Sequence, residues 1–276
     1  MKGRFETALN TLRNGIKRPL IPYLGSKWRI APQVIEHFPP HQSYCEPFGG
    51  AAAVLLSKPP CERAEVYNDL NDDLVNLFQV IRAHPGELIR ALKRTPYAEQ
   101  EYQAAFKPTR KPVERARRLI IRAHFGFHSR AVFGERCCMR YHGSRMASDA
   151  NRFHKWVQTL PLITRRLRNV TLTKQPAIRV IERMDSPQTL HYVDPPYVPS
   201  TRKSGAKYRY EMSIDAHREL LDVLQSARGY VVLSGYANEL YDDKLKKWRR
   251  VTIPTRAFSM GKVSHAEEVL WIKQDK

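Results

Sequence analysis

The sequence predicts an α/β fold in which helices cover both faces of one sheet and a smaller, mainly helical module is inserted. Three observations predict this fold. Short apolar runs alternate with longer helical patterns, an aspartate follows within two residues of the end of two of these runs, and a basic stretch without clear periodicity interrupts the alternation. With 276 residues, the chain is long enough to bury a substantial core.

The first strand and helix pair lies in the N-terminal third. Residues 64–67, Ala-Glu-Val-Tyr, are predicted to form a strand, and Asn68 and Asp69 follow it. Asn71 is suited to cap the next helix, and Asp72 and Asp73 follow where the helix dipole favours carboxylates. The apolar face of this helix is expected to carry Leu74, Leu77, Phe78 and Ile81.

A second set of elements follows in the C-terminal half. Residues 189–193 are predicted to form a strand that ends at Asp194, and residues 230–234 form another. Between them, Ser213 is expected to cap a helix that Gly229 terminates. The apolar stripe of that helix is Ile214, His217, Leu220, Leu221 and Leu224.

The middle of the chain has a different pattern. Residues 113–127 form a basic helical pattern, and residues 126–148 are polar and lack clear periodicity. We therefore expect an inserted module. The expected division is 18–84 with 169–276 for the sheet domain, 85–168 for the module, and 1–17 for an N-terminal extension.

The charge balance indicates a polyanionic partner. The chain carries 47 Lys and Arg against 27 Asp and Glu, a formal net charge of +20, and its isoelectric point is near 10.0. From Lys107 to Arg152 there are 12 Lys and Arg against 3 acids, so this stretch is a candidate nucleic-acid surface. A solvated basic surface without a partner is the alternative.

Several classes of protein are excluded or disfavoured. No apolar run approaches the roughly 18 residues that a membrane helix needs, and the first 17 residues lack the apolar centre of a secretory signal. A cytoplasmic protein is expected. The four cysteines have no Cys-x-x-Cys spacing and are interpreted as reduced thiols. A zinc site at Cys137 and Cys138 fits no standard ligand spacing, so no metal is predicted.

Residues 194–197, Asp-Pro-Pro-Tyr, follow a predicted strand at the edge where α/β sheets build their sites. The prolines stiffen this turn and carry no N–H, so it presents hydrogen-bond acceptors only. The Asp194 carboxylate and the Pro195 carbonyl are suited to the two N–H bonds of an exocyclic amine on a nucleobase. Tyr197 offers a face for stacking an extruded base. A structural proline turn is the alternative.

Two further motifs precede this turn. In residues 46–54 a small-residue turn, Glu-Pro-Phe-Gly-Gly, opens into an apolar helix, and Asp69 follows about 20 residues later, a spacing typical of nucleotide-type sites. A tight turn that simply starts a helix is the alternative. Near the N-terminus, Tyr23 and Lys27 flank a glycine turn. No triphosphate-binding motif occurs.

Together and in this order, these motifs resemble the DNA adenine methylases, the D12 class of N6-adenine methyltransferases that use S-adenosylmethionine. The resemblance covers most of the chain, and residues 194–197 match the catalytic motif without departure. Three positions differ from the family pattern: Tyr23 replaces Trp, Ser26 replaces Gly, and Ala52 replaces the last glycine of the Glu-Pro-Phe turn. Residues 267–272 look like the closing strand of the family.

The resemblance implies a Rossmann-like methyltransferase sheet, S-adenosylmethionine as cofactor, double-stranded DNA as partner, and methyl transfer to adenine N6 of a flipped base. No metal, membrane or obligate protein partner is implied. The implied catalytic residues are Asp194, Pro195, Pro196 and Tyr197. The implied cofactor-binding residues are Tyr23, Lys27, Glu46, Pro47, Phe48, Gly49, Gly50, Asp69 and Asp194. In the basic stretch, the candidates for DNA contact are Arg115, Arg118, Arg122, Arg130, Arg136, Arg140 and Arg145.

Three alternatives remain at this point. The same acceptor chemistry serves cytosine N4 or an RNA base. A DNA-binding relative without cofactor would explain the departures at Tyr23, Ser26 and Ala52. A nucleotide-dependent dehydrogenase would explain the glycine turn and Asp69, but neither Asp194 to Tyr197 nor the basic stretch.

Overall fold

The computed structural model describes residues 15–127, 129–140, 148–198, 201, 210–259 and 262–273. The chain divides into two compact units. Unit 1 comprises Met1–Arg29, Gly50–Pro59 and Asn71–Leu172, and unit 2 comprises Ile30–Gly49, Pro60–Leu70 and Thr173–Lys276. The expected module boundaries at 85 and 168 stay a prediction.

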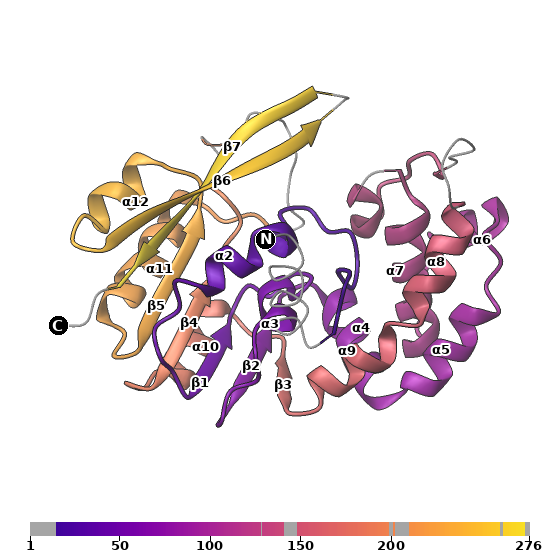
Figure 1. The fold of residues 1–276 in the computed structure, drawn as a ribbon, viewed down its shortest axis with the longest axis horizontal. Coiled ribbons are helices and arrows are strands. Elements are labelled where there is room, and N and C mark those ends of the chain that lie inside the picture. Colours follow the sequence, from indigo (N-terminus) through magenta and orange to yellow (C-terminus); the bar gives the residue numbers. More distant parts are fainter. Residues whose placement is uncertain are drawn as a thin grey trace, which may run out of the picture. The chain divides into compact units, whose positions relative to one another are not determined.

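A seven-stranded sheet with the order β3-β2-β1-β4-β5-β7-β6 dominates unit 2 (Figure 1). Strand β1 pairs in parallel with β2 and β4, and β4 pairs in parallel with β5. Strand β7 is antiparallel to both β5 and β6. The strands are β1 (Ser43–Glu46), β2 (Glu65–Asn68), β3 (Val170–Thr173), β4 (Thr189–Val193), β5 (Tyr230–Gly235), β6 (Arg249–Ser259) and β7 (Lys262–Ile272).

Helices cover both faces of this sheet (Figure 1), as the sequence predicts. On one face, Val193 and Leu233 pack in a core with Leu221 of α11 and Tyr241 of α12. On the other face, the ring of Phe38, which follows α2, lies 6.1 Å from that of Tyr44 and 5.8 Å from that of Tyr192. The helices of unit 2 are α2 (Ala31–Ile35), α10 (Ala177–Met184), α11 (Ile214–Ser226) and α12 (Glu239–Lys244).

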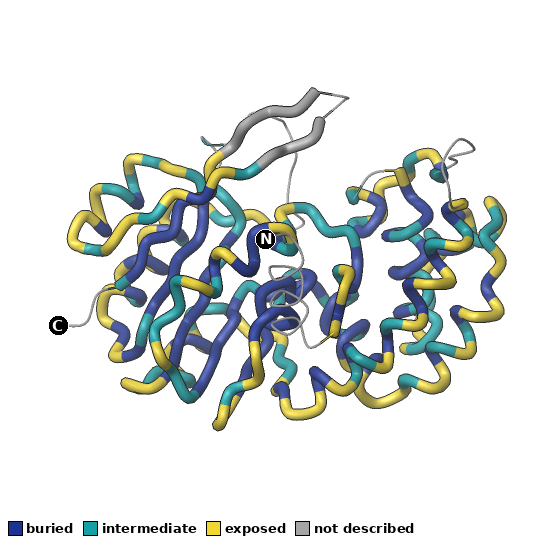
Figure 2. Tube along the Cα trace, in the orientation of Figure 1, coloured by how far each residue is buried: buried dark blue, intermediate teal, exposed yellow. Residues whose placement is uncertain are grey.

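Burial on both faces explains why these strands are apolar rather than alternating. Every residue of β4 is buried, as are all but the first of β5 (Figure 2). The predicted strands at 64–67, 189–193 and 230–234 correspond to β2, β4 and β5, and residues 267–272 lie in β7. The expected α/β fold class is confirmed.

The caps of two predicted helices are confirmed, and one predicted helix end is shifted. Asn71 Oδ1 accepts the N–H of Asp73 at 3.1 Å at the start of α4 (Asp72–Ala83), and Ser213 caps α11. Helix α11 ends at Ser226, three residues before Gly229. Gly229 instead allows the chain to pass close to the start of β4, because a Cβ at this position would lie only 2.6 Å from the Thr189 carbonyl oxygen.

Unit 1 is a helical unit built around α7 (Pro112–Phe125), which packs against α4, α5 and α6. The basic helical pattern at 113–127 is thus a helix whose apolar stripe, including Leu119 and Ile120, is fully buried. The other elements of unit 1 are η1 (Lys27–Arg29), α3 (Ala53–Ser57), α5 (Pro85–Lys93), α6 (Glu99–Ala104), η2 (Ser129–Phe133), α8 (Asp149–Val157) and α9 (Leu160–Leu167).

The chain before η1 is tied to this helical core through aromatic side chains. The Trp156 indole donates to the Pro19 carbonyl at 3.1 Å, and His124 Nε2 donates to the Leu20 carbonyl at 3.1 Å. The rings of His124 and Trp156 lie 4.1 Å apart. Burial lowers the pKa of His124 to about 4, so its imidazole is neutral at physiological pH.

Within the described ranges, none of the helices has both the length and the apolar character that crossing a membrane requires.

Candidate active site

The carboxyl ends of β1, β2 and β4 bring together the predicted site residues of unit 2. Glu46 ends β1, Asp69 follows β2, and Asp194 follows β4. The three strands are parallel neighbours, with Cys45 of β1 in register with both Val66 and His191. Their ends therefore meet at one edge, at the point where the strand order reverses between β1 and β4. That is where open α/β sheets bind ligands.

The turn after β1 lies against the end of β2. Gly49 donates its N–H to the Asn68 carbonyl at 2.8 Å, and a Cβ at Gly49 would overlap the Tyr67 ring. Only glycine allows the backbone this close approach. Pro47 is buried and Phe48 is partly buried in this turn.

Asn68 fixes this turn from inside the protein, a role that sequence reasoning missed. Its side-chain amide donates to the carbonyls of Pro47 and Gln175, both at 2.9 Å. Its oxygen accepts from Thr173 Oγ1 and from the Gln175 N–H, both at 2.8 Å. The side chain is therefore locked by four hydrogen bonds, and Asp69, the next residue, is left half-buried at the edge.

Glu46 carries a buried carboxylate at the same edge. Its side chain is 3% exposed and accepts the Tyr44 hydroxyl at 2.8 Å. Burial raises the pKa of Tyr44, and the neighbouring Glu46 charge raises it further, so the phenol stays protonated and donates.

Tyr197 lies in the turn after β4, and other residues contact both its hydroxyl and its ring. Its hydroxyl donates to Glu268 Oε2 at 2.9 Å and lies 3.3 Å from Oε1. Its ring centroid lies 4.3 Å from that of Tyr236, which follows β5 at the same edge of the sheet. Ser234 Oγ donates to Glu268 Oε1 at 2.5 Å. An aromatic residue directly after a parallel strand was the available signal for Tyr236, and sequence reasoning did not use it.

Tyr241 lies close to Asp194 behind this turn. Burial raises the pKa of Tyr241, and the Asp194 charge raises it further. The hydroxyl pairs with His217 Nδ1 at 2.9 Å, so the phenol is anchored in the core. The Asp194 carboxylate itself is half-buried and follows directly after the fully buried Val193.

Tyr23, Lys27 and Gly50 lie in unit 1. Gly50 has the left-handed φ of 50°, and a Cβ there would lie 3.2 Å from Tyr23 Cε1. Lys27 is 5% exposed and its ammonium donates to the Gly25 carbonyl at 3.1 Å. The Tyr23 ring lies 5.3 Å from that of Phe133.

Ala52, where the family pattern has glycine, also has a left-handed backbone, with φ 54° and ψ 38°. This conformation costs an L-residue with a Cβ about 1–2 kcal/mol. The left-handed conformation explains why the family pattern has glycine at this position. In this chain, alanine adopts the same conformation.

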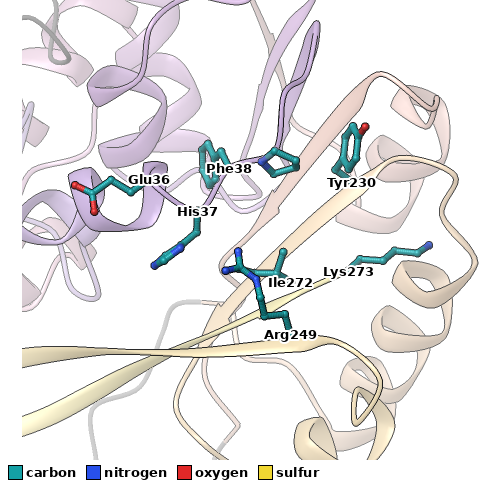
Figure 3. A pocket seen from close by; sticks show the side chains of 8 residues that line it. Glu36, His37, Phe38, Tyr230, Arg249, Ile272 and Lys273 are labelled. Atoms are coloured by element: carbon teal, nitrogen blue, oxygen red, sulfur yellow. The ribbon is translucent and has the colours of Figure 1, made fainter. Parts of the chain in front are cut away.

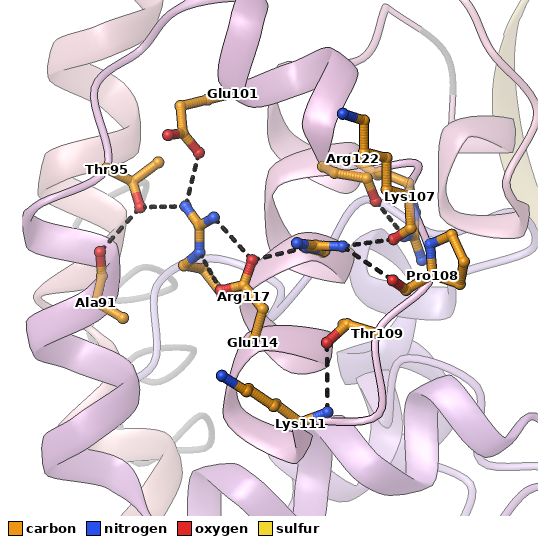
Figure 4. A network of polar contacts seen from close by, with 12 residues as sticks. Ala91, Thr95, Glu101, Lys107, Pro108, Thr109, Lys111, Glu114, Arg117 and Arg122 are labelled. Atoms are coloured by element: carbon orange, nitrogen blue, oxygen red, sulfur yellow. Dashed lines mark hydrogen bonds and ion pairs between the residues drawn. The ribbon is translucent and has the colours of Figure 1, made fainter.

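Carboxylates contact all three candidate DNA-contacting arginines of α7, Arg122 through Asp73 at 3.8 Å, and a backbone carbonyl also accepts from Arg122. Arg115 contacts Asp72 at 2.7 Å and Asp73 at 2.6 Å. Arg118 donates to Glu114 at 2.6 Å, and Arg122 to the Ala105 carbonyl at 2.7 Å. Figure 4 shows part of this network around Glu114, which also pairs with Arg117. The low pKa of Glu114 follows mainly from its hydrogen bond with Arg117.

The candidate arginines after α7 are less tightly held. Arg130 lies 3.7 Å from Glu135, and its side chain is 46% exposed. Arg136 is exposed, with its guanidinium 5.7 Å from the centroid of the Phe106 ring. Arg140 donates to the Gly126 carbonyl at 3.2 Å. Arg145 lies outside the described residues.

An open pocket of about 500 Å³ lies at the opposite edge of the sheet (Figure 3). Tyr230, the first residue of β5, and Ile272, the last of β7, line it, together with His37, Phe38 and Arg249. Because parallel strands build their sites at their carboxyl ends, this pocket is separate from the candidate site. In the described part of the chain, no group of three or more His, Cys, Asp or Glu is arranged to hold a metal ion.

Comparison with known proteins agrees with these motifs. The model of the family "D12 class N6 adenine-specific DNA methyltransferase" matches residues 23–257. A DNA adenine methylase of Vibrio cholerae (El Tor Inaba N16961) is 24% identical over 225 residues, which are 79% of this chain and 80% of that protein. The DNA adenine methylase of Haemophilus influenzae is 31% identical over 121 residues, which span 40% of this chain and only 41% of that protein.

A solved structure of a putative rRNA-methylase from Clostridium thermocellum covers 92% of this chain and 99% of its own, at 11% identity and a TM-score of 0.34. That likeness is too low to support a conclusion about fold or substrate. The family match is different, because it covers residues 23–257, most of the chain, and this range contains all three motifs. The chain belongs to the D12 class of N6-adenine-specific DNA methyltransferases.

Proposed function

We propose that the protein transfers a methyl group from S-adenosylmethionine to N6 of an adenine flipped out of double-stranded DNA, as a site-specific adenine methyltransferase. The observation that carries this proposal is the position of residues 194–197 at the carboxyl end of β4, beside the Glu46 turn and Asp69. An acceptor-only turn at a nucleotide-type edge suits an exocyclic amine.

The residues at this edge fit the proposed cofactor. Asp69 is a half-buried carboxylate at the end of β2, and it can accept both hydroxyls of a ribose. The turn at Gly49 keeps the backbone close to the Tyr67 ring. The other residues of the proposed set are Tyr23, Lys27, Glu46, Pro47, Phe48, Gly50 and Asp194. The cofactor supplies a methyl group made electrophilic by the sulfonium.

The residues of the motif have separate roles in this proposal. The Asp194 carboxylate and the Pro195 carbonyl accept the two N–H bonds of the adenine N6. As the bond from N6 to the methyl carbon forms and the bond from sulfur to that carbon breaks, positive charge develops on N6, and Asp194 stabilises it. The proton then leaves N6 for water. Tyr197 stacks on the base and Pro196 keeps the turn stiff.

Double-stranded DNA is the proposed partner, and we favour the loop after α7 for its phosphate and base contacts. Arg130, Arg136, Arg140 and Arg145 are the candidates there. Carboxylates partly neutralise the α7 arginines Arg115 and Arg118, and Arg122 is held by a backbone carbonyl, so these three contribute less to an anion surface.

The proposal is tested with unmethylated duplex DNA and tritiated S-adenosylmethionine, followed by chromatography of the released nucleosides. We expect label in N6-methyladenine, and a loss of at least about 100-fold in rate for Asp194→Ala. Asp243→Asn, an exposed change on α12, is the matched control and should behave as wild type.

Other outcomes would replace the proposal. Label in N4-methylcytosine, or label in RNA and none in DNA, would change the substrate. If no nucleic acid is labelled and calorimetry detects no binding of S-adenosylmethionine, the protein is a DNA-binding relative without the cofactor.

A further inference from the structure

Glu268 of β7 is a buried carboxylate that no predicted role uses. It is 3% exposed, and Ser234, which donates to it, is fully buried. Desolvation makes such a carboxylate costly unless hydrogen bonds compensate it. Here hydroxyls from two different parts of the chain do so: Ser234 of β5 at 2.5 Å and Tyr197 of the catalytic turn at 2.9 Å.

These contacts fix the direction of the Tyr197 hydroxyl. Both hydroxyls donate to the Glu268 carboxylate. Tyr197 Oη lies within hydrogen-bond distance of both carboxylate oxygens, at 2.9 and 3.3 Å, which limits swinging of the ring. Hydrogen bonds to a charged acceptor are about twice as strong as neutral ones.

The Tyr197 side chain keeps a freedom that the two prolines of the turn lack. Pro195 and Pro196 restrict the backbone, whereas a tyrosine side chain has two rotatable torsions. The centroid of the Tyr236 ring lies 4.3 Å from that of Tyr197, which limits movement of the Tyr197 ring toward it. Glu268 holds the hydroxyl end of Tyr197. Together these two contacts restrict the orientation of the ring before any substrate arrives.

We propose that Glu268 is a positioning residue for the methyl-accepting base: it holds the Tyr197 ring in the orientation on which the base stacks, without touching the base itself. This inference rests on the function proposed above. Alignment of reacting atoms is worth large factors in rate, because an error of about 1 Å can cost 100-fold. Loss of the anchor should therefore lower kcat and leave the binding of DNA nearly unchanged.

Glu268→Gln tests the anchor with little change in shape. An amide has one acceptor oxygen and one NH2 donor in place of two acceptor oxygens, so Ser234 and Tyr197 can no longer each donate to a separate oxygen. Tyr197→Phe removes the other end of the same contact and keeps the ring. Glu267→Gln is the matched control, because the neighbouring side chain is exposed.

We expect Glu268→Gln and Tyr197→Phe each to lower kcat about 10-fold, with KM for DNA within about 2-fold of wild type. The double variant should also lose about 10-fold, because both changes remove one contact. Glu267→Gln should match wild type. A loss near 100-fold in the double variant, or a rise in KM without a fall in kcat, would overturn the inference.

A second measurement does not depend on activity. With 3-fluorotyrosine incorporated, the ¹⁹F resonance of Tyr197 is assigned by its absence in Tyr197→Phe. We expect this resonance to shift and broaden in Glu268→Gln and to stay unchanged in Glu267→Gln. An unchanged resonance in Glu268→Gln shows that Glu268 does not hold the ring, whatever the activity.

The two proposals fail in different ways. If the wild type methylates adenine but Glu268→Gln has the kcat and the ¹⁹F spectrum of Glu267→Gln, the positioning role is wrong and the proposed function stands. If the wild type methylates no base while the Tyr197 resonance still broadens in Glu268→Gln, the proposed function is wrong and the anchoring of Tyr197 stands.

Discussion

Asn68 and Glu268 are buried polar residues, and each fixes a turn that the proposed reaction uses. Asn68, at the end of β2, bonds through its side chain once to the turn after β1, at Pro47, and three times to Thr173 and Gln175. Glu268 ties the turn after β4 to β5 and β7. In both cases the buried group is satisfied by partners, which gives it one conformation. The half-buried carboxylates of Asp69 and Asp194 are thus presented by rigid neighbours.

His124 makes the stability of unit 1 depend on pH. Its folded pKa is about 4, below the ordinary value of 6.5, because burial disfavours the charged imidazole. Below pH 6.5 the unfolded chain binds a proton that the folded chain excludes. The contribution of His124 to the free energy of unfolding is therefore constant above pH 6.5. As the pH falls from 6.5 to about 4, the free energy of unfolding decreases by up to about 1.4 kcal/mol for each pH unit.

Urea denaturation between pH 4 and 7 measures this slope. In His124→Gln, whose amide can still donate to the Leu20 carbonyl, we expect a shallower slope than in wild type. His154→Gln, an exposed change on α8, is the control and should keep the wild-type slope. Equal slopes in wild type and His124→Gln would show that His124 is not responsible.

Local chemistry decides which site residues the sequence can predict. Asp194, Pro195 and Tyr197 are neighbours in the chain, so their joint chemistry is visible in the sequence. The partners of Glu268 are distant, 71 residues away at Tyr197 and 34 away at Ser234. No local sequence pattern predicts such a contact, because the contact forms only when β7 pairs with β5 in the folded sheet.

The turn between β1 and α3 depends on three small residues with different constraints. Gly49 lies against the Tyr67 ring, Gly50 has a φ of 50°, and Ala52 has a φ of 54°. Two constraints are conformational and one is steric. The sequence predicts the turn from its glycines, and it cannot show which glycine serves which purpose.

Gly49→Ala should disrupt this turn. The new Cβ would overlap the Tyr67 ring, so the turn must move away from β2. We expect a loss of about 1–3 kcal/mol in the free energy of unfolding, as for other overpacked sites. Because the turn belongs to the proposed cofactor site, the affinity for S-adenosylmethionine should also fall, which calorimetry measures.

Gly86→Ala is the control for this prediction. Gly86 lies in the first turn of α5, and the nearest atom to a new Cβ is the flexible Arg90 Nη1 at 3.4 Å. Alanine favours a helix over glycine, so stability should stay equal or rise by up to about 1 kcal/mol. If Gly49→Ala behaves like Gly86→Ala, the close approach to Tyr67 does not constrain the turn.

Elements with strong caps or a long periodic face could be predicted, and short buried ones could not. Helices α4 and α11 have side-chain caps and clear apolar stripes. Strand β1 has only four residues, all buried, and its sequence Ser-Tyr-Cys-Glu has no strand pattern. Its place in the centre of the sheet comes from pairing with β2 and β4, which is tertiary information.

At the scale of the whole molecule, the net charge of +20 overstates how many cations face solvent freely. On α7, Arg115 and Arg117 each contact two carboxylates, and Arg118 shares Glu114. These ion pairs stabilise the helical unit around α7. The basic stretch that the sequence marks therefore divides into a structural helix and a loop with more exposed arginines.

This division predicts how DNA binding responds to salt. If the protein neutralises six to ten phosphates, its affinity for duplex DNA should fall by about 10³ to 10⁵ between 50 and 200 mM salt. Arg136→Ala removes an exposed cation and should lower the slope of log affinity against log salt by about 1. Arg115→Ala should leave the slope unchanged and lower the stability, because Asp72 loses its contact at 2.7 Å and Asp73 keeps only the longer contact with Arg122 at 3.8 Å. Fluorescence anisotropy with a labelled duplex measures the slopes. A flat response in wild type would contradict a basic DNA surface, and a reduced slope in Arg115→Ala would place α7 on the phosphates despite its carboxylates.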